Sequence, residues 1–294
     1  MTQHTSVFRL DPERIERASR LVDPALGFLE AQGHALGKAI VEYHWRGGPS
    51  DAVLDALAAY QNEDGGFGRE LEVDIKAPVS NPFAARLTMH TLLSLGDAHK
   101  GPLVDRLGEW LRREQHDDGD WHFTQEVYEA PLPPWFAGWT FPSLNPACCV
   151  GGLATRLGIS TPEMEERIGR LFARLATLEE ARSGEFYSLL PYVEYVPTAE
   201  LDDHDIWLDA VITGITTTVH KGGYADAAHF FEHALGGGPV LAARLPAELF
   251  ARFADDLIAQ REPDGGWPTP YDPSWRPSQT AAALTTLATL RDGI

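Results

Sequence analysis

The chain has 294 residues, of which 44% are hydrophobic, and it carries a formal net charge of -19 at pH 7. A chain of this length and apolar content can bury a large core as a single domain. Its negative charge repels phosphate backbones and anionic membrane surfaces, which disfavours nucleic-acid binding. No stretch reaches the roughly 20 consecutive apolar residues that cross a bilayer, so no membrane span is expected.

The N-terminus and the cysteines both favour a cytoplasmic location. The first 20 residues lack the apolar core of a secretory signal. The two cysteines, Cys148 and Cys149, are adjacent and therefore cannot join distant elements by a disulfide. We expect a cytoplasmic protein in a reducing compartment.

Helix signals recur along the chain, and period-two alternation is scarce. Residues 11–13 (Asp-Pro-Glu) supply a cap, a proline at the first helical position and an acid in the first turn. Residues 161–163 (Thr-Pro-Glu) do the same before an apolar stripe that runs from Met164 to Leu175. These patterns predict an all-α chain.

A short motif recurs three times, each time directly after an amphipathic helical pattern. It reads QNEDGGF at residues 61–67, QHDDGDW at 115–121 and QREPDGGW at 260–267. Its glycines allow positive φ angles, its aromatic residue can pack between neighbouring units, and its glutamine can satisfy backbone groups at a helix end. We interpret the motif as a structural joint and its acids as turn and capping groups.

Each joint is followed by an irregular segment and then by an alanine-rich apolar helix. These helices are expected to start near residues 80–82, 144–146 and 277–279. Small residues on all faces suit a helix packed on several sides, whereas the helices before the joints carry charged faces and are expected outside. The spacing of the successive aromatics Phe67 and Trp121 is typical of a repeat array or a closed ring.

The form Q-x-x-D-G-G-F/W, followed by an alanine-rich helix, resembles the QW-type repeats of terpene cyclases and protein prenyltransferases, also described as prenyltransferase and squalene oxidase repeats. The resemblance covers roughly residues 50 to 291. It implies an α/α toroid of outer and inner helices, with about 5–6 helical-hairpin repeats in a single domain of residues 1–294. Such toroids host cyclases, prenyltransferases and plain binding domains, so the resemblance implies the fold more than the function.

The chain departs from that family in three ways. Class II terpene cyclases carry D-x-D-D, whereas the nearest run here, from Asp202 to Asp205, reads D-D-x-D. The zinc ligands of the prenyltransferases are not matched, because Pro146 stands two residues before Cys148. Such cyclases also enclose their substrate between two helical domains, and this chain has the length for one, which leaves a homodimer or a partner domain as open alternatives.

The acidic run offers a proton donor for cyclisation. Neighbouring carboxylates that are partly buried raise one another's pKa, and a protonated acid can transfer its proton to an alkene or an epoxide. We therefore predict Asp203 as the acid, tuned by Asp202, Asp205 and His204. The alternative is that Asp202 or Asp203 caps the helix that carries Trp207. The predicted reaction is proton-initiated cyclisation of a hydrophobic isoprenoid, with no cofactor unless a diphosphate substrate brings magnesium.

The loops that follow the joints combine aromatic residues with carboxylates. Aromatic faces stabilise carbocations, and they also stack on sugar rings. The residues predicted to contact substrate are Tyr128, Trp135, Trp139, Phe141, Trp207 and Trp275. In the alternative interpretation, Trp135 and Trp139 pin a proline-rich loop to the scaffold.

Three other functions stay open. Glu72 and Asp74 alternate along the loop after the first joint, and they could serve a carbohydrate-active hydrolase or lyase, which needs paired carboxylates. His229 and His233 form an H-x-x-E-H pattern that places two imidazoles one helical turn apart, a weak zinc signal that lacks a clear third ligand. The third alternative is a toroid that binds a ligand or another protein without catalysis.

Overall fold

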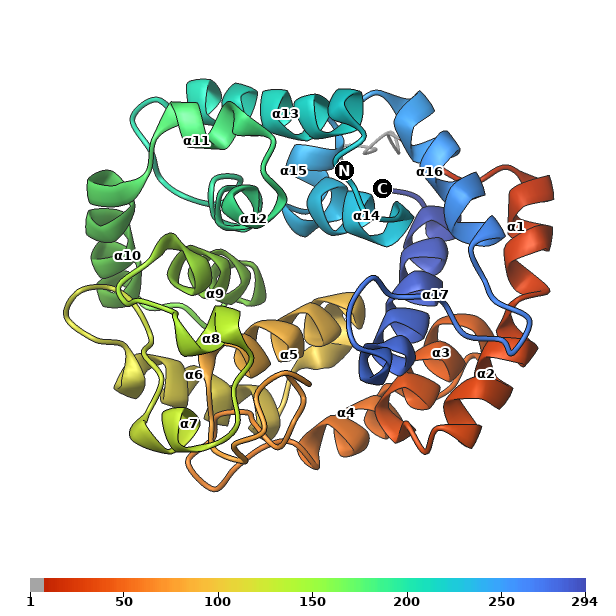
Figure 1. The fold of residues 1–294 in the computed structure, drawn as a ribbon, viewed down its shortest axis with the longest axis horizontal. Coiled ribbons are helices and arrows are strands. Elements are labelled where there is room, and N and C mark those ends of the chain that lie inside the picture. The colour runs from red at the N-terminus through yellow and green to blue at the C-terminus, as the bar shows by residue number, and fades with distance from the viewer. Residues whose placement is uncertain (1–7) are drawn as a thin grey trace. The chain divides into compact units, whose positions relative to one another are not determined.

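The computed structural model describes residues 8–294 (Figure 1). Residues 1–7 lie outside the described range. They belong to the first 20 residues, for which the sequence analysis predicted no secretory signal. The described part is helical, and its one β feature is an isolated bridge between Gln61 and Phe67. The all-α prediction is therefore confirmed. Among residues 8–294, no helix is both long enough and apolar enough to cross a membrane.

Contacts group the chain into two compact units, whereas the sequence analysis placed residues 1–294 in one domain. Unit 1 joins the N-terminal segment up to residue 56 with residues 218–294, and unit 2 comprises residues 57–217. In unit 1 the backbone N–H of Leu10 donates to the carbonyl of Leu290 at 2.9 Å. The Trp45 indole likewise donates to the carbonyl of Leu284 at 2.9 Å. Local sequence patterns carry no signal for such pairing between the two ends of a chain.

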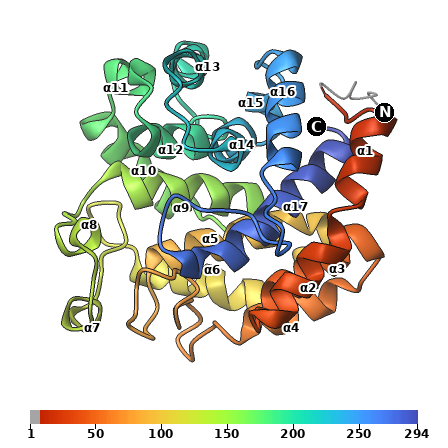
Figure 2. The same cartoon turned by 45° about the vertical axis from the view of Figure 1, so that its right-hand side comes forward.

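The helices of the two units appear in Figures 1 and 2. Unit 1 contains α1 (Pro12–Ser19), α2 (Val22–Ala31), α3 (Ala35–Arg46), α14 (Ala227–Gly236), α15 (Pro239–Ala242), α16 (Ala247–Ala259), η2 (Pro273–Trp275) and α17 (Arg276–Asp292). Unit 2 contains α5 (Pro82–Ser94), η1 (Gly96–His99), α6 (Pro102–Glu114), α7 (Gln125–Glu129), α8 (Pro134–Ala137), α9 (Leu144–Leu157), α10 (Pro162–Leu175), α11 (Leu178–Ser183) and α12 (Phe186–Tyr195). The unit boundaries fall inside α4 (Ser50–Ala58) and α13 (His204–Lys221).

The core of unit 2 is built around α9, which packs against both α5 and α12 (Figures 1 and 2). Every residue from 146 to 154 is buried, as expected for a helix with small residues on all faces. The helices α6 and α10 instead bury a single apolar face and expose their charged residues. The sequence-predicted difference between helices packed on several sides and helices packed on one side is therefore confirmed within this unit.

The predicted helix starts agree closely with the structure. The side chains of Asp11, Asn81 and Thr161 each accept a hydrogen bond from a backbone N–H three residues ahead, at the starts of α1, α5 and α10. The start of α17 differs slightly, because the 3₁₀ turn η2 leads directly into Arg276. The start of α9 also differs, since Asn145 has non-helical backbone angles that kink its first turn.

The two copies of the joint in unit 2 form the same hydrogen bonds through their glutamines. The side-chain amide of Gln61 donates to the carbonyls of Gly65 and Leu103, each at 2.9 Å. The amide of Gln115 donates to the carbonyls of Gly119 and Met164, each at 3.3 Å. Each glutamine thus ties its own turn to the following helix, which confirms its predicted structural role.

A glycine of each joint presses against the backbone of a neighbouring helix. Gly65, Gly119 and Gly265 have φ angles of 94°, 97° and 99°. A Cβ atom added at these three glycines would lie 2.5, 2.5 and 2.2 Å from the carbonyl oxygens of Arg106, Arg167 and Pro24, respectively. The third joint therefore packs on α2 at the N-terminal end of unit 1, much as the first two pack on α6 and α10 in unit 2.

Candidate functional site

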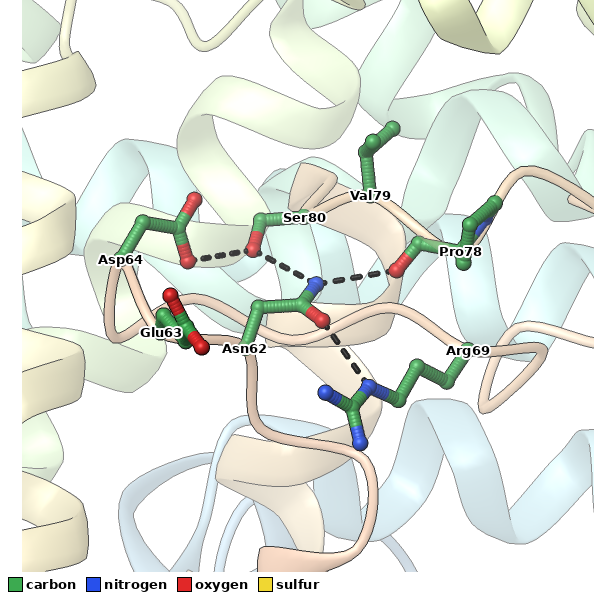
Figure 3. Close-up of a pocket in the computed structure, with 7 residues that line it drawn as sticks. All are labelled: Asn62, Glu63, Asp64, Arg69, Pro78, Val79 and Ser80. Carbon is green, nitrogen blue, oxygen red and sulfur yellow. Dashed lines mark hydrogen bonds between the residues drawn. The ribbon is translucent and has the colours of Figure 1, made fainter.

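A hollow beside the first joint has a volume of about 410 Å³ (Figure 3). The side chains that line it bond mainly to one another: Asn62 donates to Ser80 and to the carbonyl of Pro78, Ser80 donates to Asp64, and Arg69 donates to Asn62. The Oδ1 atom of Asp64 also accepts from the N–H of Gly66 at 2.9 Å. These bonds serve the turn itself, so the hollow is part of the joint's architecture.

The predicted acidic cluster lies at the N-terminal end of α13, where Asp202, Asp203 and Asp205 are exposed to solvent. The Nε2 atom of His204 lies 3.0 Å from the carbonyl oxygen of Val196. The expectation that His204 orients one of these acids is therefore not met by its hydrogen bond. Their exposure at the start of a helix favours the capping interpretation.

The structure divides the predicted aromatic residues into packed and exposed groups. Trp139 and Phe141 pack against a buried apolar cluster that includes Phe83, Phe123 and Phe136. The ring centroid of Trp139 lies 4.9 Å from that of Phe83, and that of Phe141 lies 5.2 Å from that of Phe123. Trp139 therefore pins the loop between α7 and α9 to unit 2, as the alternative interpretation proposed, and Phe141 does the same. Trp135, which that interpretation also named, is exposed.

Tyr128 and Trp135 belong to the same loop region but are 47% and 58% exposed. Trp207 lies half-buried on α13, with its ring centroid 4.9 Å from that of Phe172 and 6.0 Å from that of Tyr192. Trp275 is half-buried in η2 of unit 1. Within unit 2, Tyr128 and Trp135 are thus the predicted aromatics most accessible to a ligand.

The two rim carboxylates Glu72 and Asp74 lie in the loop before α5. Glu72 is buried, and its Oε1 atom accepts a hydrogen bond from the backbone N–H of Asp74 at 3.2 Å. Asp74 is half-buried. This bond gives Glu72 a role in shaping the loop.

The two histidines of the H-x-x-E-H pattern each bond to a tyrosine. The Nε2 atom of His229 lies 2.7 Å from the hydroxyl of Tyr271, and the Nδ1 atom of His233 lies 2.9 Å from the hydroxyl of Tyr224. Among the described residues, no group of three histidine, cysteine, aspartate or glutamate side chains is placed to hold a metal ion. The pattern therefore resolves into two histidine–tyrosine pairs.

A buried ionic cluster that the sequence analysis did not identify joins α5 to α12. Glu194 is fully buried, and its carboxylate accepts hydrogen bonds from Nε of Arg86 at 3.0 and 3.1 Å and from Nη2 of Arg86 at 2.5 Å. The Nε2 atom of His90 lies 2.8 Å from Oε1 of the same carboxylate. The side chain of His90 is 32% exposed, so it links the buried carboxylate to solvent.

Electrostatics keep Glu194 ionised in this cluster. Burial raises the pKa of Glu194, but the positive charge of Arg86 and the contact with His90 outweigh it and hold the pKa well below its ordinary range. Arg156 on α9 also interacts electrostatically with Glu194, although burial lowers the pKa of this arginine. Two arginines and a histidine thus surround a single carboxylate.

The arrangement has the geometry of an oriented general base. A buried carboxylate that bonds one nitrogen of an imidazole fixes its orientation and stabilises its protonated form. A buried ion pair on its own contributes little net stability compared with apolar packing. The partly exposed His90 at its edge therefore makes this cluster the strongest candidate site in the described chain.

The sequence carries a signal for this site. Arg86 and His90 are spaced four residues apart in a helix predicted to be packed on several sides, and Glu194 interrupts the apolar run SLLPYVEYV. Charged residues in such segments indicate a buried pair, but their pairing depends on a contact between residues 104 or more positions apart.

Comparison with protein-family models, with curated proteins and with solved structures gives no match to this chain.

Proposed function

We propose that the chain is a proton-transfer enzyme for a hydrophobic substrate with an anionic group, and that His90 exchanges the proton. The observation that carries this proposal is the 2.8 Å contact between Nε2 of a partly exposed His90 and the fully buried carboxylate of Glu194. A base within hydrogen-bond reach of a buried carboxylate is a common feature of general acid–base catalysis.

The roles of the three side chains follow from their charges. Arg86 keeps Glu194 ionised, and Glu194 accepts the Nε2 proton of His90. In this tautomer, Nδ1 of the neutral imidazole is the basic atom. His90 then takes a proton from the substrate, and the imidazolium that results is stabilised by Glu194.

The surrounding charge and the resemblance together indicate the substrate class. Arg86 and Arg156 carry two positive charges against the single negative charge of Glu194, in a chain whose net charge is -19, and this positive excess attracts an anionic group. The resemblance to terpene cyclases indicates an isoprenoid, and an isoprenoid diphosphate combines both properties. In a cyclisation that begins with protonation, the imidazolium of His90 gives its proton to the substrate. The neutral imidazole then takes a proton back from the final carbocation, so the proton is returned at the end of the cycle. No step is assigned to a resident metal, and magnesium would arrive with the diphosphate.

The α/α toroid of about 5–6 hairpin repeats is part of this proposal. Its support is the recurrence of one joint, with the same glycine contact, at Gly65, Gly119 and Gly265. We also place the activity in the cytoplasm, since the free and buried Cys148 and Cys149 fit a reducing compartment. A homodimer or a partner domain would supply the second enclosing surface found in such cyclases.

The predicted acid Asp203 fits this chemistry less well than His90. An acid that protonates an alkene must be shielded from water, because water competes for both the proton and the carbocation. Asp202 and Asp203 are exposed. We therefore assign the Asp202–Asp205 run to the start of α13 in this proposal.

A carbohydrate-active enzyme is the second candidate, and it is favoured by the exposure of Trp135 and Tyr128. Exposed aromatic rings form platforms for sugar faces, and Glu72 and Asp74 lie in another loop of the same unit. In this alternative the two carboxylates, and not His90, would act on the glycosidic bond.

A thermal-shift panel tests the proposal and separates the candidates. The ligands are farnesyl and geranylgeranyl diphosphates with and without magnesium, squalene analogues, and neutral and uronate oligosaccharides. A ligand at about 100 times its Kd should add roughly 2.7 kcal/mol of stability. Stabilisation by a diphosphate that weakens in Arg86→Met supports the proposal. Stabilisation by an oligosaccharide alone, or by no ligand in the panel, contradicts it.

A further inference from the structure

A second ordered set of polar side chains lies at the start of α14 in unit 1. Asp226 caps this helix, since its Oδ1 atom accepts from the backbone N–H of His229 at 2.9 Å. The same oxygen lies 2.7 Å from Nδ1 of the His229 ring. The opposite ring nitrogen, Nε2, lies 2.7 Å from the hydroxyl of Tyr271.

The three residues differ in exposure, since Asp226 and His229 are largely buried and Tyr271 is exposed. His229 and Asp226 have side chains that are 8% and 11% exposed. Tyr271 lies in the loop before η2 and is 44% exposed. The carboxylate and the imidazole are therefore shielded, while the phenol is accessible to a reactant.

These hydrogen bonds connect a carboxylate to an imidazole and the imidazole to a hydroxyl. Nucleophilic triads have the same order of groups, and they are recognised by geometry and not by residue spacing. With Nδ1–H of His229 donated to Asp226, Nε2 is the acceptor for the phenol proton of Tyr271. Burial lowers the pKa of His229, but the hydrogen bond and the charge of Asp226 outweigh it and raise the pKa overall.

The other histidine on α14 provides an internal comparison. His233 bonds to the hydroxyl of Tyr224, and its side chain is fully buried. Burial raises the pKa of Tyr224 well above its ordinary range, which disfavours a phenolate there. Of the two histidine–tyrosine pairs, the pair with Tyr271 joins an accessible hydroxyl to a histidine held by a carboxylate.

We propose that Asp226, His229 and Tyr271 form a nucleophilic triad, separate from the His90 site, in which Tyr271 accepts an acyl group from an ester. The phenol oxygen bonds to the acyl carbon, the ester oxygen leaves with the electron pair of the broken bond, and the phenol proton passes to Nε2 of His229. Asp272 adjoins the nucleophile, and Glu232 acts electrostatically on His229. These negative charges favour an uncharged ester over a phosphate ester.

Acetylation by p-nitrophenyl acetate tests this triad. The rate of label incorporation is measured for each tyrosine by peptide mass spectrometry, and Tyr128 serves as the control because its 47% exposure matches the 44% of Tyr271. We expect Tyr271 to be acetylated at least about 100-fold faster than Tyr128, the effect typical of a positioned general base. Equal rates in the wild-type protein overturn the proposal without any need for a variant.

Two substitutions then test the order of the triad. Asp226→Asn retains a good helix cap but removes the charge that faces His229, and His229→Gln removes the base. Both should reduce the acetylation rate of Tyr271 by about 10-fold or more and leave that of Tyr128 unchanged. If the acetylation rate of Tyr271 is unchanged in both variants, and circular dichroism shows an intact fold, its reactivity does not depend on the triad and the assignment is wrong.

Discussion

Gly152 of α9 lies so close to Glu194 of α12 that a Cβ atom at position 152 would be 2.0 Å from the Glu194 carbonyl oxygen. The same Cβ atom would be 2.8 Å from Cα of Tyr195. This approach is available to glycine alone, and it sets the distance between the helix that carries Glu194 and the core helix of unit 2. The backbone of α9 therefore helps to position the candidate site.

Gly152→Ala should destabilise the protein, because neither backbone can move without disturbing the packing of α9 on α12. We expect a loss of about 1–3 kcal/mol in the free energy of unfolding, measured by urea denaturation. Gly27→Ala is the matched control, since a Cβ atom there meets nothing within 4 Å in the middle of α2. That control should gain roughly 0.5–1 kcal/mol. Equal effects at the two positions would show that the close approach of α9 and α12 is not a constraint.

Removing one partner of the buried ion pair should cost more than removing both. Glu194→Gln leaves the guanidinium of Arg86 buried without a counter-charge, and we expect a loss of about 3–5 kcal/mol in the free energy of unfolding. The double variant Arg86→Met with Glu194→Met removes both charges and should be less destabilised than Glu194→Gln. Chemical denaturation of the wild-type protein, Glu194→Gln and the double variant provides the comparison. A double variant that is the least stable of the set would mean that the pair itself is a major source of stability.

Asp120 should make stability depend on pH. Its carboxylate is fully buried where the other joints have Gly66 and Gly266, and it accepts from the N–H groups of Trp121 at 2.8 Å and Ser143 at 2.9 Å. Burial raises the pKa of Asp120 to about 7 from 3.8, against the opposing effect of these hydrogen bonds. Between those pH values the folded state binds more protons than the unfolded state, so the contribution of Asp120 to stability falls as pH rises from about 4 to 7.

The variant Asp120→Ala isolates this effect from other titrating groups. The variant loses two hydrogen bonds at every pH, but only the wild-type protein carries the cost of an ionised buried carboxylate at high pH. The difference in unfolding free energy between the two proteins should therefore be larger at pH 5 than at pH 8. Urea denaturation at both pH values measures it, and a difference that is the same at both would mean that Asp120 keeps an ordinary pKa.

The two tryptophans of the loop after the second joint should differ sharply when truncated. Trp139→Ala removes ring contacts with Phe83 and Phe136 and the indole hydrogen bond to Ser143, so we expect a loss of roughly 2–3 kcal/mol in the free energy of unfolding. Trp135→Ala removes a side chain that is 58% exposed and should change stability by less than about 0.5 kcal/mol. If Trp135→Ala is the more damaging, the packed and exposed assignments are reversed.

The helices and joints were predictable because their signals are local. The caps Asp11 and Thr161, the glycines with positive φ and the glutamine at each helix end all act within a few residues or on the next helix. The glutamine and the glycine therefore recur at equivalent positions in each copy of the joint. This repetition in the sequence is enough to predict that the joint has a structural role.

The candidate site was not predictable because its contacts join distant parts of the chain. His90 and Glu194 are 104 positions apart, and His229 and Tyr271 are 42 apart. The most conspicuous local cluster, Asp202 to Asp205, lies at the exposed start of α13. Acids that are dense in the sequence need not be buried, whereas a single glutamate in an apolar run usually must find a partner.

The most direct test of the account is the rate of product formation by three variants on an isoprenoid diphosphate that binds in the thermal-shift panel. The variants are His90→Gln, which keeps a hydrogen-bond donor for Glu194 but cannot accept a proton at neutral pH, Asp203→Asn, and the exposed control His220→Gln. We expect His90→Gln to lower kcat by about 100-fold or more and the other two to stay within about twofold of the wild type. Loss of turnover in Asp203→Asn together with full activity in His90→Gln would contradict the account and return the catalytic role to the acidic run.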